Sequence, residues 1–185
     1  MRLSTPLVLA MALAAGLLGL FAERHLHRSR TPFPIAGAPA SASRPGDPMP
    51  ALALPGRDGK TVRLPADFAR RPLLVNFWAS WCAPCLREMP ELDRYSREQA
   101  GNGVQVIGIA LDTPEAVDRF LAQVPVGYPI LLDTPGDADA SVRLGNARGV
   151  LPYSVLVGAD GRIVAQKAGP FAAGELAGWG RNPDP

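Results

Sequence analysis

Two cysteines, Cys82 and Cys85, are the residues of this sequence whose type and spacing best suit chemistry. They are the only cysteines in the 185 residues, and Ala83 and Pro84 separate them. Thiols three positions apart on a helix are close enough to form a disulfide, and such a pair exchanges with other disulfides through thiolate attack. The spacing therefore predicts thiol–disulfide exchange.

The segments around the cysteines are predicted to place the pair at the start of a helix. Residues 73–78 form a short run of apolar and β-favouring residues, typical of a strand buried on both faces. Apolar side chains then recur at helical spacing over 86–92, and Pro84 suits a first helical turn. Unpaired N–H groups and the helix dipole stabilise a thiolate at a helix N-terminus. Cys82 is therefore predicted to be the attacking thiol, and Cys85, inside the first turn, the resolving thiol.

The segment Trp78-Ala79-Ser80-Trp81-Cys82-Ala83-Pro84-Cys85 resembles the active site of thioredoxin-fold oxidoreductases. With Leu86-Arg87-Glu88-Met89-Pro90 it is similar to membrane-anchored, extracytoplasmic thiol:disulfide oxidoreductases of the TlpA and cytochrome c maturation (DsbE-like) type. The resemblance extends from roughly Asp47 to Phe171, the length of a domain. It implies an α/β, thioredoxin-like fold in which helices flank a central mixed sheet, with an N-terminal β-hairpin and a central strand–helix insertion.

One departure from thioredoxin directs attention to Glu88. Asn76 stands where thioredoxin has a buried Asp, and an amide cannot take up that proton. In the resembling subfamily a carboxylate three residues after the second cysteine is implicated in proton handling, and Glu88 occupies that position. An i, i+3 pair shares one helix face, so Glu88 could accept a proton from Cys85 directly or through water. The alternative is a solvated first-turn carboxylate that favours the helix dipole.

A second part of the site is predicted at residues 149–157, where a proline opens an apolar run. The resemblance implies that Pro152 is a cis-proline facing the cysteine pair, which would leave the backbone of Leu151 free to pair with an extended substrate. The alternative is an ordinary trans proline at a strand start. Trp81 and Tyr153 could line a hydrophobic docking surface. The expected catalytic residues are Cys82, Cys85, Glu88 and Pro152, and the expected substrate contacts are Trp81, Ala83, Pro84, Leu151 and Tyr153.

Strands and helices alternate through the remaining domain, which favours an α/β sheet with parallel neighbours. The expected elements are a hairpin formed by 51–54 and 61–64, strands at 104–111 and 130–132, helices at 114–123, 138–144 and 175–179, and an antiparallel hairpin turning at 160–161.

The first 46 residues differ in composition from the rest. Residues 1–23 contain an uncharged apolar run at the short limit for a membrane-spanning helix, so we predict a membrane anchor or an uncleaved signal. Residues 24–46 are rich in Pro, Ala, Ser and Gly and are predicted to be a tether. The thioredoxin-like domain is expected over 47–180, and residues 181–185 are expected to be a frayed tail.

The orientation in the membrane follows from two opposing signals. Arg24, Arg28 and Arg30 outnumber the positive groups before the apolar run, and the positive-inside rule alone would keep the domain in the cytoplasm. The resembling family, however, is extracytoplasmic. We therefore expect a single-pass inner-membrane protein whose catalytic domain faces the periplasm, or a soluble periplasmic protein if the signal is cleaved.

These features predict an enzyme, a protein-disulfide oxidoreductase that needs no cofactor or metal. The resemblance suggests that it reduces a cysteine pair in apocytochrome c or a copper-site assembly protein, and that a membrane-embedded donor reduces it again. The alternatives are a general disulfide oxidant and a copper chaperone using the thiolates of Cys82 and Cys85. A formal charge of +2, without a basic run interleaved with aromatic residues, argues against nucleic-acid binding.

Overall fold

The computed structural model describes residues 42–68, 71–99 and 103–179. The expected anchor, nearly all of the expected tether and the expected tail lie outside these ranges. Among the helices in the described ranges, none has the length and apolar character needed to cross a bilayer.

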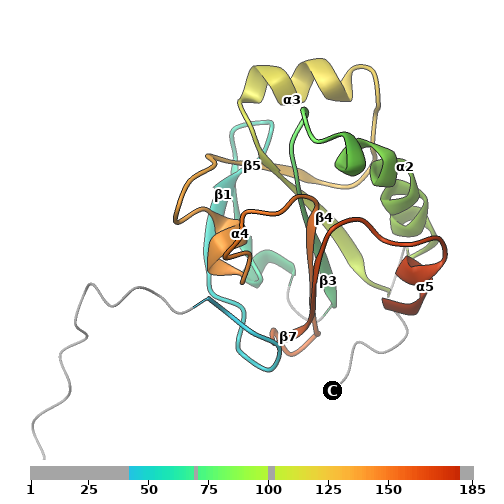
Figure 1. The fold of residues 1–185 in the computed structure, drawn as a ribbon. Coiled ribbons are helices and arrows are strands. Elements are labelled where there is room, and N and C mark those ends of the chain that lie inside the picture. Colours follow the sequence, from blue (N-terminus) through green and yellow to red (C-terminus); the bar gives the residue numbers. More distant parts are fainter. Residues whose placement is uncertain (1–41, 69–70, 100–102, 180–185) are drawn as a thin grey trace, which may run out of the picture. The chain divides into compact units, whose positions relative to one another are not determined.

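A five-stranded mixed sheet forms the centre of the domain (Figure 1). In spatial order its strands are β5 (Ile130–Asp133), β4 (Gln105–Leu111), β3 (Leu73–Trp78), β6 (Tyr153–Val157) and β7 (Ile163–Ala168). β3, β4 and β5 run parallel, whereas β6 is antiparallel to β3 and β7 is antiparallel to β6. β3 is the central strand and all six of its residues are buried, as its continuous apolar run predicts.

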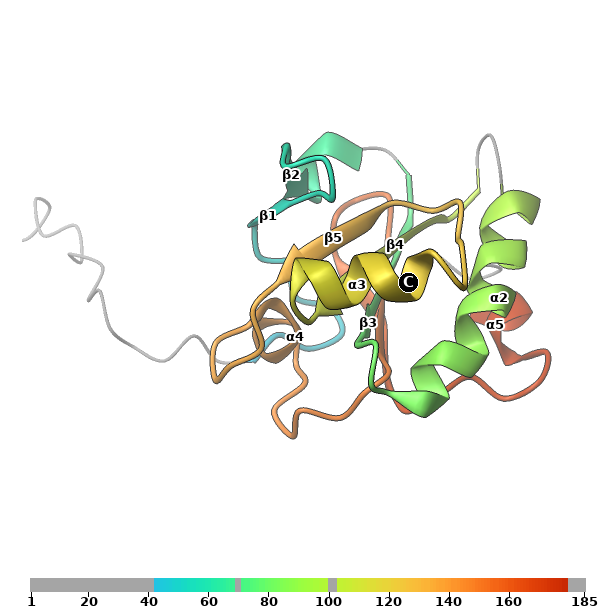
Figure 2. The same ribbon diagram turned by 90° about the horizontal axis from the view of Figure 1, so that it is seen from above.

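Helices and a hairpin cover the two faces of this sheet. On one face lie α2 (Ala83–Glu98), α3 (Pro114–Leu121) and α5 (Glu175–Trp179). On the other lie the hairpin of β1 (Leu52–Pro55) and β2 (Thr61–Leu64), and α4 (Ala140–Arg143). Figures 1 and 2 show α2 and α5 together on one side, with the hairpin and α4 on the other. A short 3-10 helix, η1 (Ala66–Phe68), follows β2.

The alternation of side chains along β3 divides the core into two clusters. Leu74 and Trp78 point to the face that carries α2, and Val75 and Phe77 point to the face that carries the hairpin. The same alternation in β4 and β6 gives each cluster a contribution from every central strand. β3 is thereby held rigidly, and the cysteine pair follows directly from its end.

The predicted α/β thioredoxin-like architecture is confirmed, with β5 and α4 as the central strand–helix insertion. α4 is shorter than predicted and begins at Ala140. The reason is that the Asp139 side chain accepts hydrogen bonds from the amides of Ser141 and Val142 and so acts as the N-cap. Thr113 caps α3 in the predicted way.

Candidate active site

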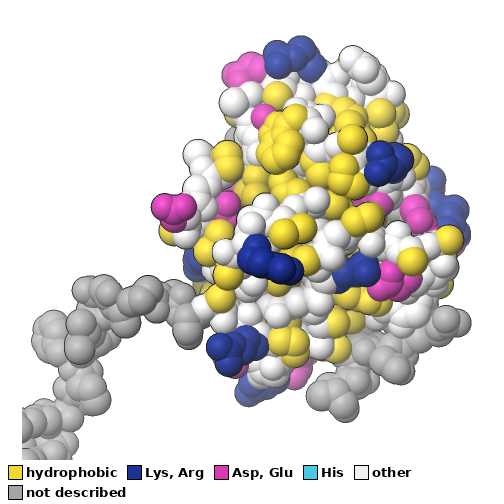
Figure 3. Space-filling model, viewed as in Figure 1, with side chains coloured by type: hydrophobic (Ala, Val, Ile, Leu, Met, Phe, Trp, Pro, Cys, Tyr) yellow, Lys and Arg dark blue, Asp and Glu magenta, His cyan; other side chains and the backbone are white. Residues whose placement is uncertain are grey.

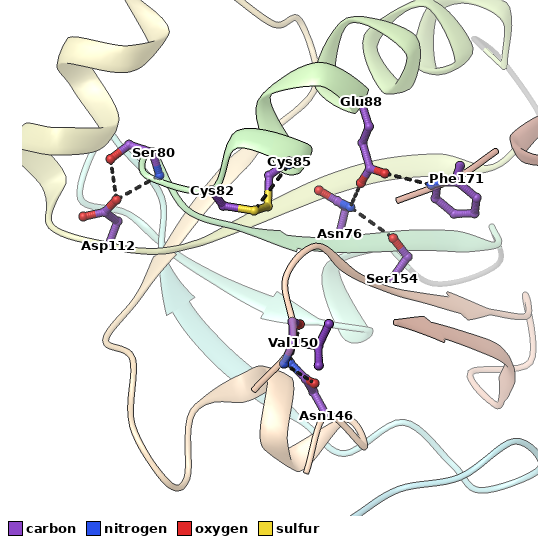
Figure 4. The surroundings of a disulfide bond; sticks show 10 residues. All are labelled: Asn76, Ser80, Cys82, Cys85, Glu88, Asp112, Asn146, Val150, Ser154 and Phe171. Carbon is purple, nitrogen blue, oxygen red and sulfur yellow. Dashed lines mark hydrogen bonds between the residues drawn. A yellow bond between two sulfur atoms is a disulfide. The ribbon is translucent and has the colours of Figure 1, made fainter. Parts of the chain in front are cut away.

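Cys82 and Cys85 form a disulfide at the N-terminus of α2, with their Cα atoms 5.3 Å apart (Figure 4). Cys82 is the N-cap residue, and its Sγ accepts a hydrogen bond of 3.3 Å from the Cys85 amide. Cys82 is 5% exposed and Cys85 is fully buried. The predicted placement is therefore confirmed. In the reduced state the Cys85 amide and the helix dipole would favour the thiolate of Cys82.

Asp112, the residue after β4, holds the turn that leads into Cys82 (Figure 4). Ser80 donates its amide and its hydroxyl to Asp112 Oδ2, at 2.9 and 2.6 Å, and the Thr113 amide donates to Oδ1 at 2.8 Å. Partial burial opposes the charged form, but these hydrogen bonds and the charge of Arg119 outweigh it, so the pKa of Asp112 is lowered. The active-site turn is thus fixed to the end of β4.

Asp112→Ala is expected to lower the free energy of unfolding by about 2 kcal/mol at pH 7, because three donors lose an ionised acceptor. The folded-state pKa of Asp112 lies below its unfolded value, so its contribution is fully present above the unfolded pKa and is lost as the pH falls through the folded pKa. The difference between wild type and variant should therefore shrink below about pH 4. Urea unfolding across this pH range measures both effects.

The matched control is Ser80→Ala, which removes only the hydroxyl bond to Asp112 and should cost less. Equal stability of Asp112→Ala and wild type at pH 7 would show that Asp112 does not hold the turn.

Glu88 is buried between α2 and the sheet, with 6% of its surface exposed. Its Oε1 accepts a hydrogen bond of 2.7 Å from Asn76 Nδ2, and its Oε2 accepts one of 3.0 Å from the Phe171 amide (Figure 4). Asn76 Nδ2 also donates to Ser154 Oγ at 3.0 Å. A solvated first-turn carboxylate, the alternative for Glu88, is excluded by this burial.

The environment of Glu88 suits a proton acceptor. Burial is the largest influence and raises the pKa of this carboxyl, while the hydrogen bonds from Phe171 and Asn76 partly oppose it. A raised pKa brings the carboxylate nearer to the range in which a general base works at neutral pH. Cys85 lies three residues earlier on α2, a spacing that places the two side chains on one face of the helix.

The Leu151–Pro152 peptide bond is cis, as the resemblance implied, and the trans alternative is excluded. Strand register pairs Phe77 with Tyr153, so Pro152 lies near the end of β3 from which Cys82 follows. Within the described part of the chain, the backbone of Leu151 makes no hydrogen bond. The structure thus brings the two predicted parts of the site to one end of the sheet.

Trp81 is the outstanding exposed side chain of the site, and among the described residues it is the only exposed large hydrophobic one, at 71%. Trp81 and Leu151 line a groove of about 460 Å³, whose other wall comes from the segment between β5 and α4 and from α4 itself. Ala83 is exposed and Pro84 is half-buried beside the disulfide. Figure 3 shows hydrophobic side chains between the charged ones on the face of the domain seen in Figure 1.

Tyr153 does not belong to this exposed surface. It is 5% exposed, its hydroxyl donates to Leu144 O at 3.1 Å, and its ring lies 6.2 Å from that of Phe77. Alternation along β6 directs Tyr153 to the hairpin face of the sheet. This placement corrects the expectation that Tyr153 lines a docking surface.

Sequence reasoning missed the partners that hold the site in place, chiefly Asp112, Ser154 and the amide of Phe171. Asp112 had a usable signal, because the carboxyl ends of parallel strands meet at one edge of a sheet. Ser154 and Phe171 had none, since their contacts depend on the register of β6 and the path of the chain after β7. Within the described residues, no cluster of three or more His, Cys, Asp or Glu side chains is arranged to hold a metal ion.

The mixed sheet, the disulfide at the start of α2 and the cis-proline at the same end of the sheet define a thiol–disulfide oxidoreductase of the thioredoxin superfamily. The chain belongs to the Redoxin family, whose model matches residues 44–178. It is 28% identical over 135 residues to the thiol-disulfide oxidoreductase ResA of Bacillus cereus, covering 72% of this chain and 75% of ResA.

Two further comparisons agree with this assignment. The chain is 35% identical over 153 residues to the thiol:disulfide interchange protein HelX of Rhodobacter capsulatus, covering 74% of this chain and 81% of HelX. Its fold matches a thiol-disulfide oxidoreductase from Bacteroides fragilis with a TM-score of 0.62 and 27% identity, covering 71% of this chain and 96% of that one. These similarities support the resemblance to the TlpA and DsbE-like type.

Proposed function

We propose that this oxidoreductase reduces cysteine pairs of client proteins outside the cytoplasm, anchored in the inner membrane by residues 1–23. The observation that carries the proposal is the Cys82–Cys85 pair at the start of α2, with the buried Glu88 one turn beyond Cys85. The similarity to ResA and HelX supports a cysteine-containing protein as substrate. The preferred client is apocytochrome c or a copper-site assembly protein.

The reaction proceeds in two exchanges. The thiolate of Cys82 attacks one sulfur of the client disulfide, forming a mixed disulfide and releasing the other client sulfur as a thiolate that takes a proton. Cys85 then gives its proton to Glu88 and attacks Cys82 Sγ, which breaks the bond between Cys82 Sγ and the client sulfur. That client sulfur leaves as a thiolate and takes up a proton. The client leaves as a dithiol, and Cys82 and Cys85 are left as a disulfide. Two electrons have passed to the client, and a membrane-embedded donor returns two to the protein.

Electron transfer to a defined client tests the proposal. The reduced full-length chain is mixed with a synthetic peptide whose Cys-x-x-Cys-His segment, the c-type haem attachment pattern, is in the disulfide form. We expect the peptide to be reduced about tenfold faster, per molar disulfide, than oxidised glutathione, because the groove beside Trp81 adds binding energy. Equal rates with the peptide and with glutathione would contradict binding of the client in the groove.

Export is tested by fusing alkaline phosphatase after Pro185. The fused phosphatase is expected to be active in cells only while residues 1–23 are present.

A further inference from the structure

We propose that Asn146 is a positioning residue that holds loop 147–151 as one wall of the substrate groove and presents the Leu151 backbone to an extended client segment. The inference rests on the proposed function and adds a residue to which neither the sequence patterns nor the chemistry of the cysteines points. It is carried by the contacts of Asn146, by the anchoring of the loop that follows it, and by the unpaired backbone at the end of that loop.

Asn146 is 3% exposed, and all of its side-chain polar atoms have partners; Figure 4 shows its side chain against Val150. Its Oδ1 accepts a hydrogen bond of 3.0 Å from the Val150 amide, and its Nδ2 donates to Val150 O at 2.9 Å and to Ser141 Oγ at 3.2 Å. The backbone N–H of Asn146 donates to the backbone oxygen of Ser141 at 2.9 Å. Asn146 therefore ties Val150 to the first turn of α4 and satisfies both backbone groups of Val150.

The residues that lead into the loop are fixed to the sheet. Leu144 O accepts hydrogen bonds from the Tyr153 hydroxyl at 3.1 Å and from Gln166 Nε2 at 2.7 Å. Gly145 follows at a φ of +103°, and a Cβ there would lie only 2.5 Å from Gln166 Nε2. β6 and β7 thus fix the segment that leads into the loop, while Asn146 fixes Val150 near its end. Because the chain is held before the loop and again at Val150, the residue that follows Val150 can be presented in one conformation.

Leu151 is that next residue, and its position suits a peptide substrate. Its N–H and C=O have no partner among the described residues, whereas both groups of Val150 are occupied by Asn146. Leu151 and Trp81 line the same groove, and Trp81 directly precedes Cys82. An extended client segment lying in this groove can pair with Leu151 while its cysteine reaches Cys82, so the occupant is the part of the client that carries the cysteine pair.

Asn146→Ala separates docking from thiol reactivity. The reduced full-length chain reacts with the oxidised Cys-x-x-Cys-His peptide and, separately, with the small disulfide dithiobis(nitrobenzoate), which does not need the groove. We expect kcat/KM for the peptide to fall about tenfold, mainly through KM, and the rate with the small disulfide to stay within about twofold. Ser141→Ala, which keeps both bonds to Val150, should lower the peptide rate less.

Equal peptide kinetics in Asn146→Ala and wild type, or equal losses with both disulfides, would overturn the proposal. Failure of the wild type to reduce the peptide would instead overturn the proposed function, so the two failures are distinguishable. If Asn146→Ala does not fold, the pairing of Leu151 with the client is tested instead by hydrogen exchange of backbone amides, in a variant that retains Asn146. In the mixed disulfide between Cys85→Ser and the peptide, the Leu151 amide should exchange more slowly than in the free variant, and unchanged exchange would contradict the role of Leu151.

Discussion

Cys82→Ser is expected to lower the rate of client reduction by roughly a thousandfold or more, because serine supplies no thiolate to attack the client disulfide. Cys85→Ser should retain the first exchange, because Cys82 keeps its place at the start of α2. It should then stop at the mixed disulfide, since no second thiol remains to attack Cys82 Sγ. The measurement is non-reducing electrophoresis of each variant with the oxidised peptide, together with the rate of peptide reduction.

The two serine variants also control for each other, because both lack the disulfide and differ only in which thiol remains. Reduced wild type is the reference for their stability. Full activity in either variant would refute the two-cysteine mechanism, and accumulation of mixed disulfide by Cys82→Ser instead of Cys85→Ser would reverse the roles assigned to the two thiols.

Glu88→Gln is expected to slow resolution of the mixed disulfide about a hundredfold, because an amide cannot take the proton from Cys85. In the wild type, resolution should slow as the pH falls through the pKa of Glu88, which burial raises above its ordinary value. The variant should lack this dependence. Stopped-flow measurement of the second exchange across acid to neutral pH tests both statements.

The same substitution has a predictable effect on stability. The folded-state pKa of Glu88 is raised, so the folded chain binds more protons than the unfolded chain between the ordinary and the raised pKa, and the stability of the wild type falls as pH rises through this window. Gln carries no titrating group. The difference in free energy of unfolding, variant minus wild type, should therefore increase with pH across the window.

Glu98→Gln is the matched control, since Glu98 is an exposed carboxylate on the same helix that pairs with Arg94, far along α2 from the disulfide. It should leave both the resolution rate and its pH profile unchanged. A Glu88→Gln variant that resolves the mixed disulfide at the wild-type rate, with the wild-type pH profile, would remove Glu88 from the mechanism.

Local sequence pattern predicted the parts of the site that depend on neighbouring residues. The buried strand, the proline in the first turn and the spacing of the cysteines together place Cys82 at a helix N-terminus, and the structure has it there. The cis bond before Pro152 was implied by the family resemblance, because nothing in the surrounding residues distinguishes it from a trans bond. Glu88 was likewise implied by the resemblance, and its i, i+3 spacing from Cys85 agreed with that role.

The remainder of the site depends on contacts between distant segments. The Asp112–Ser80 bonds span 32 positions of sequence and the Phe171–Glu88 bond spans 83. Such contacts follow from strand register and chain path, which local periodicity does not encode. Tyr153 illustrates the same limit, because a period of two shows that residues alternate but not which set faces which cluster. Asn146 is a different case, because its bond to Val150 spans only four positions but depends on the conformation of the turn after α4, which side-chain periodicity does not predict.

The direction of electron flow is the central claim, and the reduction potential of the Cys82–Cys85 pair tests it most directly. The full-length chain in detergent is equilibrated with glutathione or dithiothreitol buffers, and the fraction of dithiol is measured by thiol alkylation. We predict a value at or below about −220 mV, as a reductant fed by a membrane donor requires. A value near −120 mV, that of a strong disulfide donor, would contradict the proposed function.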